Sequence, residues 1–322
     1  MSSIPRPKLA LKLSPPAIAL LLAVGLFALG GILRPGFANY SLAVNILRLA
    51  AFLGIIAAGQ TLVIISGGEG IDLSVGAVVT LGAILIYRLT NGQDALILPA
   101  LAATLAIGAA IGAINGLGIT LLRIPPLVMT LGMTGVVEGL ILVFTQGRLE
   151  GSAAPLVVGL VSSPFIFGIP GVVLVWILLG VGVWLILERT SYGKQLFAIG
   201  VNRTTAKLSG VRVNTVLVIT YTLSGLLAAL GGFVLLGYVQ RVFLNLGAAY
   251  TLPSVAAVVI GGTLLAGGEG GYAGTMAGAL VLTLLTSLLT TLQLPEFARQ
   301  IVYGITLLLL LSVYGRQRRL RS

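Results

Sequence analysis

The chain contains no cysteine and no histidine, and only 8 of its 322 residues are aspartate or glutamate. These absences exclude disulfide bonds, thiolate nucleophiles, histidine-based metal sites and histidine proton relays. Charged residues make up 8% of the chain, whereas they make up about a quarter of a soluble domain. We therefore expect a membrane protein without a metal site or catalytic residues, rather than a water-soluble enzyme.

Long apolar runs dominate the rest of the sequence. Hydrophobic residues make up 57% of the chain, and the mean hydropathy is +1.12. This pattern predicts an all-α, polytopic integral membrane protein with about ten transmembrane helices, some of them broken by glycine-rich segments. The predicted spans are residues 16–33, 42–65, 71–89, 96–121, 126–145, 170–188, 214–240, 252–266, 271–292 and 297–314. Since the eighth and ninth spans are interrupted, a count of about eight or nine is the alternative.

The loops between the spans are short, so the sequence predicts a single transmembrane domain at 16–314, between a tail at 1–15 and a basic tail at 315–322. The net charge is +11, and most basic residues flank the first span, follow the last span or lie in one inner loop, 188–213. They are Arg6, Lys8, Lys12, Arg189, Lys194, Arg203, Lys207, Arg212, Arg316, Arg318, Arg319 and Arg321. By the positive-inside rule, both tails and this loop are expected in the cytoplasm, and we expect no nucleic-acid partner.

The stretch SGGEGIDLSVGAVV places Glu69 and Asp72 beside four glycines within otherwise apolar sequence. A carboxylate that faces lipid costs several kcal/mol, and each glycine weakens a helix by about 1 kcal/mol relative to alanine. We therefore expect one helix to end near Gly67 and the next to begin near Leu73, with Asp72 or Ser74 capping its N-terminus. The alternative interpretation is that Asp72 is only such a cap, in a tight turn at the inner membrane surface, without contact to a substrate.

The letters GGEG return at residues 267–270 and again precede an apolar run. The small residues that follow them permit close contact between helices. The repeat is interpreted either as duplicated architecture around a central pathway or as a coincidence among 44 glycines. The candidate residues for the pathway or the helix breaks are Gly68, Glu69, Asp72, Ser74, Asn115, Gly268 and Glu269.

Other polar and aromatic residues also lie in or near the spans. Gln60, Asn115 and Glu138 would be costly to bury without partners, so we expect interhelical hydrogen bonds, with contact to the pathway as the alternative. Aromatic side chains near span ends are predicted to anchor the membrane interfaces, and they are Tyr87, Trp176, Trp184, Tyr221 and Tyr303.

Four stretches carry a family resemblance. They are GQTLVIISGGEGIDLSVGAVVTLGAI (59–84), NGLGITLLRIPPLVMTLGMTGVVEGLILVFTQGR (115–148), YGKQLFAIGVNRTTAKLSGVRV (192–213) and VAAVVIGGTLLAGGEGGYAGTMAGAL (255–280). In this order they resemble the permeases of bacterial ATP-binding-cassette (ABC) importers for ribose, xylose and related monosaccharides, over residues 40–312. One departure is GGEGIDLSVG, since many relatives read GGIDLSVG and the break is therefore longer in this chain.

The resemblance implies a permease subunit in the bacterial inner membrane that forms the path for a ribose-like sugar. A periplasmic sugar-binding protein would deliver the sugar, and a second copy of the chain or a sister permease would complete a dimer. A separate cytoplasmic ATPase would bind ATP and Mg²⁺, so this chain would be no enzyme and would bind no cofactor. In agreement with this, no G-x-x-x-x-G-K-[ST] motif occurs, because Lys194 is followed by Gln195.

The inner loop 188–213 has helical spacing of apolar residues, which predicts a short amphipathic helix at the membrane surface with Thr204 or Thr205 as a cap. A loop that binds only lipid headgroups is the alternative. By motif match, the resemblance implies that this loop couples the permease to the ATPase through Gly193, Lys194, Ala198, Gly200, Asn202, Ala206, Ser209 and Gly210.

A function from another class is an ion-coupled secondary transporter of a small polar solute. Such proteins also use broken helices near the middle of the membrane. In that case the ion-coupling site would be Glu69, Asp72, Glu138 or Glu269.

Overall fold

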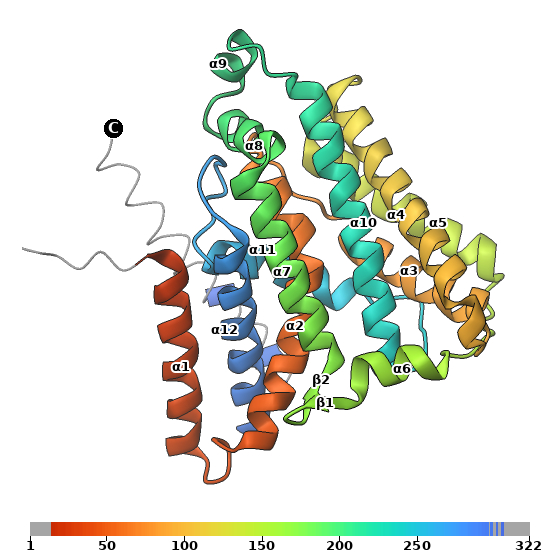
Figure 1. Cartoon of the computed structure of the whole chain (residues 1–322), viewed down its shortest axis with the longest axis vertical. Coiled ribbons are helices and arrows are strands. Elements are labelled where there is room, and N and C mark those ends of the chain that lie inside the picture. Colours follow the sequence, from red (N-terminus) through yellow and green to blue (C-terminus); the bar gives the residue numbers. More distant parts are fainter. Residues whose placement is uncertain (1–13, 296, 299–300, 302–303, 306–322) are drawn as a thin grey trace, which may run out of the picture.

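The computed structural model describes residues 14–295, 297–298, 301 and 304–305, and most of these residues lie in helices (Figure 1). The long helices among them are α1 (Pro15–Leu33), α2 (Tyr40–Ile65), α4 (Ile97–Thr120), α5 (Pro126–Thr145), α7 (Gly171–Arg189), α10 (Val213–Val239) and α12 (Tyr272–Thr291). The shorter helices are α3 (Val75–Thr90), α6 (Pro155–Ser162), α8 (Ser191–Val201), α9 (Arg203–Leu208) and α11 (Thr251–Ile260). The remaining described elements are the 3₁₀ turns η1 (Asp94–Leu96) and η2 (Ala248–Tyr250) and the antiparallel strands β1 (Pro164–Ile166) and β2 (Ile169–Pro170).

The predicted all-α, polytopic membrane architecture is confirmed. Within the described part of the chain, 7 helical segments are long and apolar enough to cross a membrane. Three helices, α1, α5 and α6, begin at a proline, where the missing N–H group removes no helical hydrogen bond. Local sequence therefore sets several of the helix boundaries.

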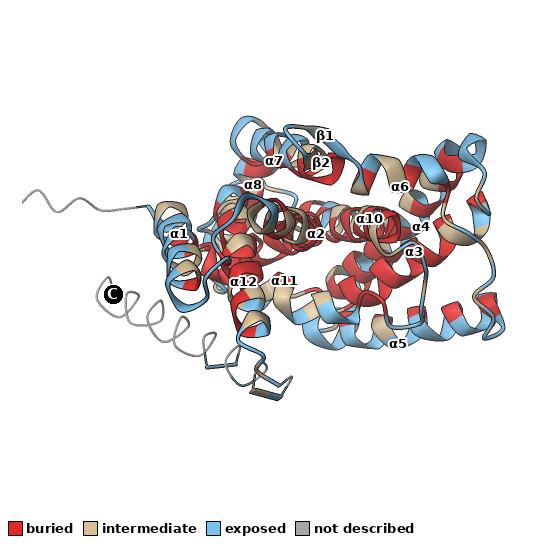
Figure 2. Cartoon of the chain, turned by 90° about the horizontal axis from the view of Figure 1, so that it is seen from below, coloured by how far each residue is buried: buried red, intermediate tan, exposed pale blue. Residues whose placement is uncertain are grey.

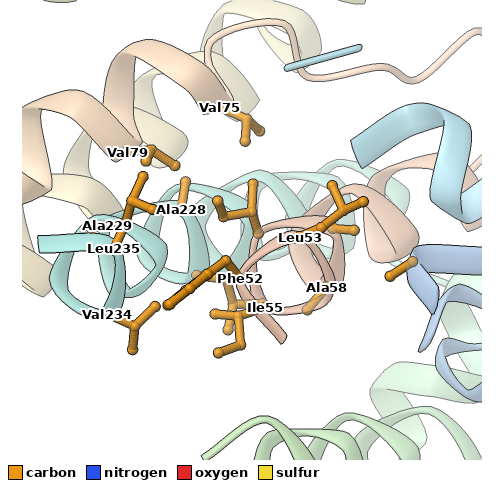
Figure 3. Packing of buried hydrophobic residues seen from close by; sticks show 14 of the residues in the cluster. Phe52, Leu53, Ile55, Ala58, Val75, Val79, Ala228, Ala229, Val234 and Leu235 are labelled. Atoms are coloured by element: carbon orange, nitrogen blue, oxygen red, sulfur yellow. The ribbon is translucent and has the colours of Figure 1, made fainter. Parts of the chain in front are cut away.

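Helices α2 and α10 form the centre of the bundle (Figure 2). Helix α10 packs against α4, α3 and α2, while α12 packs against α1, α2 and α11. Phe52 and Ile55 of α2 meet Val79 of α3 and Ala228 and Val234 of α10 in the buried apolar core (Figure 3). Helices α1 and α5 lie at opposite edges and expose many apolar side chains, as expected for surfaces that face lipid or another membrane subunit.

Glycines allow the central helices to approach closely. A Cβ atom added to Gly112 of α4 would overlap the carbonyl oxygen of Tyr221 in α10. A Cβ atom on Gly225 of α10 would likewise overlap the carbonyl oxygen of Gly108 in α4. Part of the high glycine content is thus explained by helix–helix packing, as is common in membrane bundles.

Two predicted spans are shorter in the structure. The span predicted at 71–89 is α3, which begins at Val75, and the one predicted at 252–266 is α11, which ends at Ile260. With 16 and 10 residues, these helices fall short of the about 20 residues that cross the hydrocarbon core. The predicted span 297–314 lies mostly outside the described residues, as do most of the two predicted tails.

The prediction of interfacial anchors was wrong for Trp176 and Tyr221, which are 3% and 1% exposed. Trp176 Nε1 donates a hydrogen bond to the hydroxyl of Tyr272 (3.1 Å), which donates to the carbonyl of Gly54 (2.8 Å). Tryptophan and tyrosine are thus used here to join α7, α12 and α2 inside the bundle, because both carry a donor at the end of an apolar ring. Tyr303 lies outside the described residues.

Candidate coupling and translocation site

The first GGEG segment is a true helix break. Helix α2 ends at Ile65 and α3 begins at Val75, so residues 66–74 connect them, as the glycines and carboxylates predict. The chain reverses in a left-handed turn, because the φ angles of residues 67–69 are 66°, 62° and 60°. Two of these three residues are glycines, which adopt this conformation without a steric penalty.

The side chain of Gln60 holds this break against α2. Its Nε2 donates to the carbonyl oxygen of Asp72 (3.0 Å), and its Oε1 accepts from the N–H group of Asp72 (3.1 Å). Gln60 is fully buried, so one amide side chain satisfies two backbone groups that no helix pairs. Gln60 therefore has hydrogen-bond partners inside the bundle, but they lie in the connection between α2 and α3 and not on another helix, as the expected interhelical bond would require.

The carboxylate of Asp72 is buried and makes three hydrogen bonds. Its Oδ1 accepts from the N–H group and the hydroxyl of Ser74 (3.0 and 2.6 Å), and its Oδ2 accepts from the hydroxyl of Ser224 in α10 (2.8 Å). Asn115 of α4 donates from Nδ2 to the hydroxyl of Ser74 (3.0 Å). Ser74 occupies the N-cap position of α3, but its side chain makes no capping hydrogen bond, so the predicted cap is not formed by the side chain of Asp72 or Ser74. The carboxylate of Asp72 instead bonds to Ser74 and links the start of α3 to α10, while Asn115 links it to α4.

Helix α5 holds the other side of the break through two threonines. Thr130 Oγ1 accepts from the N–H group of Leu73 (3.1 Å) and lies 3.2 Å from the carbonyl oxygen of Ile71. Thr134 Oγ1 donates to the carbonyl oxygen of Leu73 (3.1 Å). Sequence reasoning did not identify either threonine, because threonines at this spacing are common in any membrane helix.

The second GGEG segment packs directly onto the first. The N–H group of Gly268 donates to the carbonyl oxygen of Ile65, the last residue of α2 (2.9 Å). A Cβ atom on Gly267 would overlap the Cα atom of Gly67. The two repeated motifs, far apart in the sequence, thus form one backbone-to-backbone contact.

The C-terminal end of helix α8 packs against this contact between the two GGEG segments. A Cβ atom on Gly200 would overlap both the carbonyl oxygen of Ile65 and the N–H nitrogen of Gly268. We call Gly67, Gly200, Gly267 and Gly268 the glycine junction. It joins the two breaks to α8 and α9, which lie at one end of the bundle (Figure 1).

Two further side chains attach α8 and α9 to the bundle. Arg203, the first residue of α9, donates from Nη2 to the carbonyl oxygen of Gly67 (3.0 Å). The hydroxyl of Tyr192 in α8 lies 2.9 Å from that of Thr220 in α10, and Thr220 itself donates to Val216 in its own helix (2.8 Å), so Tyr192 is the donor. Burial raises the pKa of Tyr192 to about 12, and the hydrogen bond to Thr220 opposes this only in part. The phenol is therefore neutral at physiological pH.

The predicted surface helix is present as two helices, and their caps differ from the prediction. Thr190 accepts from the N–H group of Gly193 (3.2 Å) at the start of α8, and Asn202 accepts from that of Thr205 (3.0 Å) at the start of α9. The predicted cap at Thr204 or Thr205 was wrong. Asn202 lies in the extended region, with φ −159° and ψ 110°, which suits a residue that precedes a helix.

The structure divides the sequence-predicted residues into groups. Of the expected coupling residues, Lys194, Ala198, Asn202, Ser209 and Gly210 are exposed at the α8–α9 end, whereas Gly193 and Ala206 are buried and Gly200 is half-buried in the glycine junction. Of the expected path or break residues, Asp72, Ser74 and Asn115 are buried together, Gly68, Glu69 and Glu269 are exposed, and Gly268 is half-buried. Glu138 is exposed on α5 and does not make the expected interhelical bond with any of the described residues.

Two buried polar atoms near Asp72 have no hydrogen-bond partner among the described residues. They are Oδ1 of Asn115 and the hydroxyl of Tyr221. Buried polar atoms of this kind are usually paired with water or a ligand. Within the described part of the chain, no group of three or more histidine, cysteine or acidic side chains could hold a metal ion.

The comparisons with known proteins point in one direction. Residues 42–311 match the family described as the branched-chain amino acid transport system / permease component. This match decides the family. The chain belongs to it.

Individual permease proteins are also similar to this chain along most of their length. The ribose import permease protein RbsC of Escherichia coli strain K12 is 35% identical over 303 residues, 91% of each chain. RbsC of Bacillus subtilis strain 168 is 38% identical over 293 residues, 89% of each chain. The autoinducer 2 import system permease protein LsrC of Yersinia enterocolitica is 34% identical over 301 residues, 93% of this chain and 82% of LsrC.

The resemblance to permeases of ABC importers is thereby confirmed, and the chain is a multi-pass membrane permease component of such an importer. No solved structure gives a significant match to its sequence.

Proposed function

We propose that this permease forms the path for a ribose-like monosaccharide and couples it to a separate ATP-hydrolysing subunit through α8 and α9. The observation that carries the proposal is the glycine junction, in which Gly200 of α8 contacts both helix breaks at once. A force applied to α8 and α9 from outside the bundle would reach the breaks directly. The exposed residues Lys194, Asn202, Ser209 and Gly210 are the proposed contacts to the ATPase.

The proposed cargo is an uncharged, hydroxylated solute. The buried polar groups between α3, α4 and α10 are hydroxyls and amides around a single carboxylate that is already paired three times. Asn115 Oδ1 and the Tyr221 hydroxyl remain without a partner among the described residues and could bind a sugar hydroxyl or a water that follows it. Two of the similar permeases are named for ribose, which supports this class of substrate.

Autoinducer 2 is the second candidate cargo, because LsrC is named as a permease for its import. The identity to LsrC, 34%, is close to the 35% and 38% identity to the two RbsC proteins. A transport assay with both solutes separates these candidates.

The proposed topology places α8, α9 and both chain ends in the cytoplasm of a bacterium, with about ten passes through the inner membrane. A Cβ atom on Gly262 would overlap Pro15, so α1 begins next to the second break, at the α8–α9 end. Residues 16–314 would form one domain between short tails at 1–15 and 315–322. The exposed apolar faces of α1 and α5 would contact lipid or a second permease subunit, either a copy of this chain or a sister chain.

The geometry gives little support to an ion-coupled secondary transporter. Glu69, Glu138 and Glu269 are exposed and belong to separate segments. Asp72 is buried, but its oxygens already accept hydrogen bonds from Ser74 and Ser224. The membership in a permease family of ABC importers also favours an ATP-driven mechanism.

The test is a reconstitution. The chain is purified with the ATP-hydrolysing subunit that it captures, inserted into liposomes with ATP inside, and supplied with a sugar-binding protein and radioactive ribose outside. We expect ribose uptake that requires all these components. The rate of uptake should be the same with and without a proton gradient. Uptake driven by a proton gradient, without any ATPase subunit, would contradict the proposal.

A further inference from the structure

Arg203 lies where α8 and α9, which we call the coupling helices, meet the first break. Its Nη2 donates to the carbonyl oxygen of Gly67 (3.0 Å), and its guanidinium group lies where a Cβ atom on Gly68 would be. The Nε atom of Arg203 is also buried, yet it has no hydrogen-bond partner among the described residues. Burying a guanidinium N–H group without a hydrogen-bond partner costs free energy, so we expect the Nε–H group of Arg203 to have an acceptor.

Glu69 directly follows Gly68, the glycine whose Cβ position is filled by the guanidinium group of Arg203. It is therefore the acidic residue closest to this contact in the sequence. It has a φ angle of 60°, a left-handed conformation that costs free energy for any residue with a Cβ atom. Its side chain is exposed and makes no hydrogen bond or ion pair with a described residue. A glycine would fit this backbone without strain, so the carboxylate is the feature that needs an explanation.

We propose that Arg203 is the positioning residue that fastens the coupling helices to the first break, and that Glu69 is its acceptor when the ATPase subunit is docked. When the Glu69 carboxylate moves onto the Nε side of the guanidinium group, it accepts a charge-assisted hydrogen bond from Nε. The carbonyl of Gly67 bonds to Nη2 and does not supply this acceptor. Glu269 is a weaker candidate, because the neighbouring Gly268 contacts Val201 rather than Arg203. This inference rests on the proposed docking of an ATPase to α8 and α9.

The consequence is a short mechanical path from α9 to the buried carboxylate. Arg203 holds Gly67 at one end of the break, and Gln60 and Ser224 hold Asp72 further along the same segment. If α9 is tied to Gly67 and Glu69, any displacement of α9 pulls on the segment that carries Asp72. Coupling should therefore depend on Arg203 more than on neighbouring basic residues.

The experiment measures ribose uptake and ATP hydrolysis in the reconstituted complex. We expect R203A and E69Q each to lower the ribose transported per ATP hydrolysed by about tenfold, as the loss of a charge-assisted hydrogen bond predicts. R203K should retain part of the coupling, because it keeps the charge without the fork of donors. R212A is the matched control, since Arg212 is exposed in the same inner loop, and it should leave coupling unchanged.

A charge swap separates a direct pair from a structural effect. R203E and E69R should each uncouple transport, and the double variant R203E/E69R should regain coupling to within about threefold of the unmodified protein. The proposal is overturned if R203A and E69Q couple normally, or if the double variant is no better than the two single variants. Size-exclusion profiles of the purified complexes show that each compared variant is assembled.

A second measurement does not depend on transport. Because the chain has no cysteine, E69C and R203C can be introduced without removing a native thiol. We expect a disulfide to form readily in the docked complex, and its failure to form there would overturn the pairing. If the unmodified protein captures no ATPase at all, the proposed function fails instead, so the two failures are distinguishable.

Discussion

The two GGEG breaks share four letters but are held in place by different means. The first break is held by side chains, because Gln60, Ser224 and Thr130 all bond to residues 71–74. The second contributes backbone atoms, namely the N–H group of Gly268 and the bare Cα atom of Gly267. The same motif thus serves as a polar anchor in one place and as a close-packing surface in the other.

This difference suggests a division of roles between the breaks. A network of directed hydrogen bonds fixes one register, since each buried group requires its own partner. Contact between glycine backbones relies on close packing and, among the described residues, on one directed bond between these segments, from Gly268 to Ile65. We therefore expect the first break to set the resting structure and the second to move against it during transport.

The largest expected effect comes from the side-chain anchor. D72A would leave the N–H group and hydroxyl of Ser74 and the hydroxyl of Ser224 without an acceptor. Since each unpaired buried donor costs roughly 1–3 kcal/mol, we expect a loss of about 3–5 kcal/mol in the free energy of unfolding. Thermal unfolding of the purified protein in detergent measures it.

D94A is the matched control for this variant. Asp94 accepts one hydrogen bond, from the N–H group of Leu156 at the exposed surface (2.9 Å). We expect D94A to unfold close to the temperature of the unmodified protein. If D72A were equally mild, the first break would not depend on its side chains and the contrast between the breaks would disappear.

A smaller effect is expected at the backbone contact. G267A would place a Cβ atom against Gly67, in a residue whose φ angle is 86°. Strain and overlap together should cost about 2–3 kcal/mol, and transport should fall more steeply than stability, because the contact has to slide. G271A is the control, since nothing lies within 4 Å of its Cβ position. Equal transport by both variants would argue against a moving second break.

Much of this arrangement could be predicted from the sequence. Glycines beside Glu69 and Asp72 cost too much within a continuous helix in lipid, so a break was the natural expectation. The place of Asp72 beside the start of α3 follows from the preference of carboxylates for helix N-termini, although its bonds go to Ser74 and Ser224 rather than to the first turn of the helix. The spans 16–33, 42–65 and 126–145 agree with α1, α2 and α5, because prolines, charges or polar turns bound them.

The rest depends on contacts between distant segments, for which one sequence carries no signal. Thr130, Thr134 and Tyr192 resemble ordinary membrane-helix and interface residues until the fold brings them to the break or to α10. The repeated GGEG suggested either duplication or coincidence, but the contact between Gly67 and Gly267 is visible only in three dimensions. In the sequence alone, Arg203 is likewise only one of several basic residues in the loop 188–213.

The smallest expected effect tests the link between α8 and α10, since α8 also carries Gly200, which contacts both breaks. Y192F removes the hydrogen bond to Thr220, which should lower the free energy of unfolding by about 1 kcal/mol, and T220V should give a similar loss. The double variant should lose no more than either single variant, because both remove the same bond.

The pH dependence of Y192F gives an independent readout of the same bond. Burial raises the pKa of Tyr192 from 10.0 to about 12, so as the pH rises the unfolded chain loses this proton first. The contribution of Tyr192 to stability is therefore complete below pH 10 and declines from there to about pH 12. Y192F should lack this decline while differing from the unmodified protein by a constant amount at lower pH. A difference that already changes with pH near neutrality would mean that another group, and not the buried phenol, holds α8 against α10.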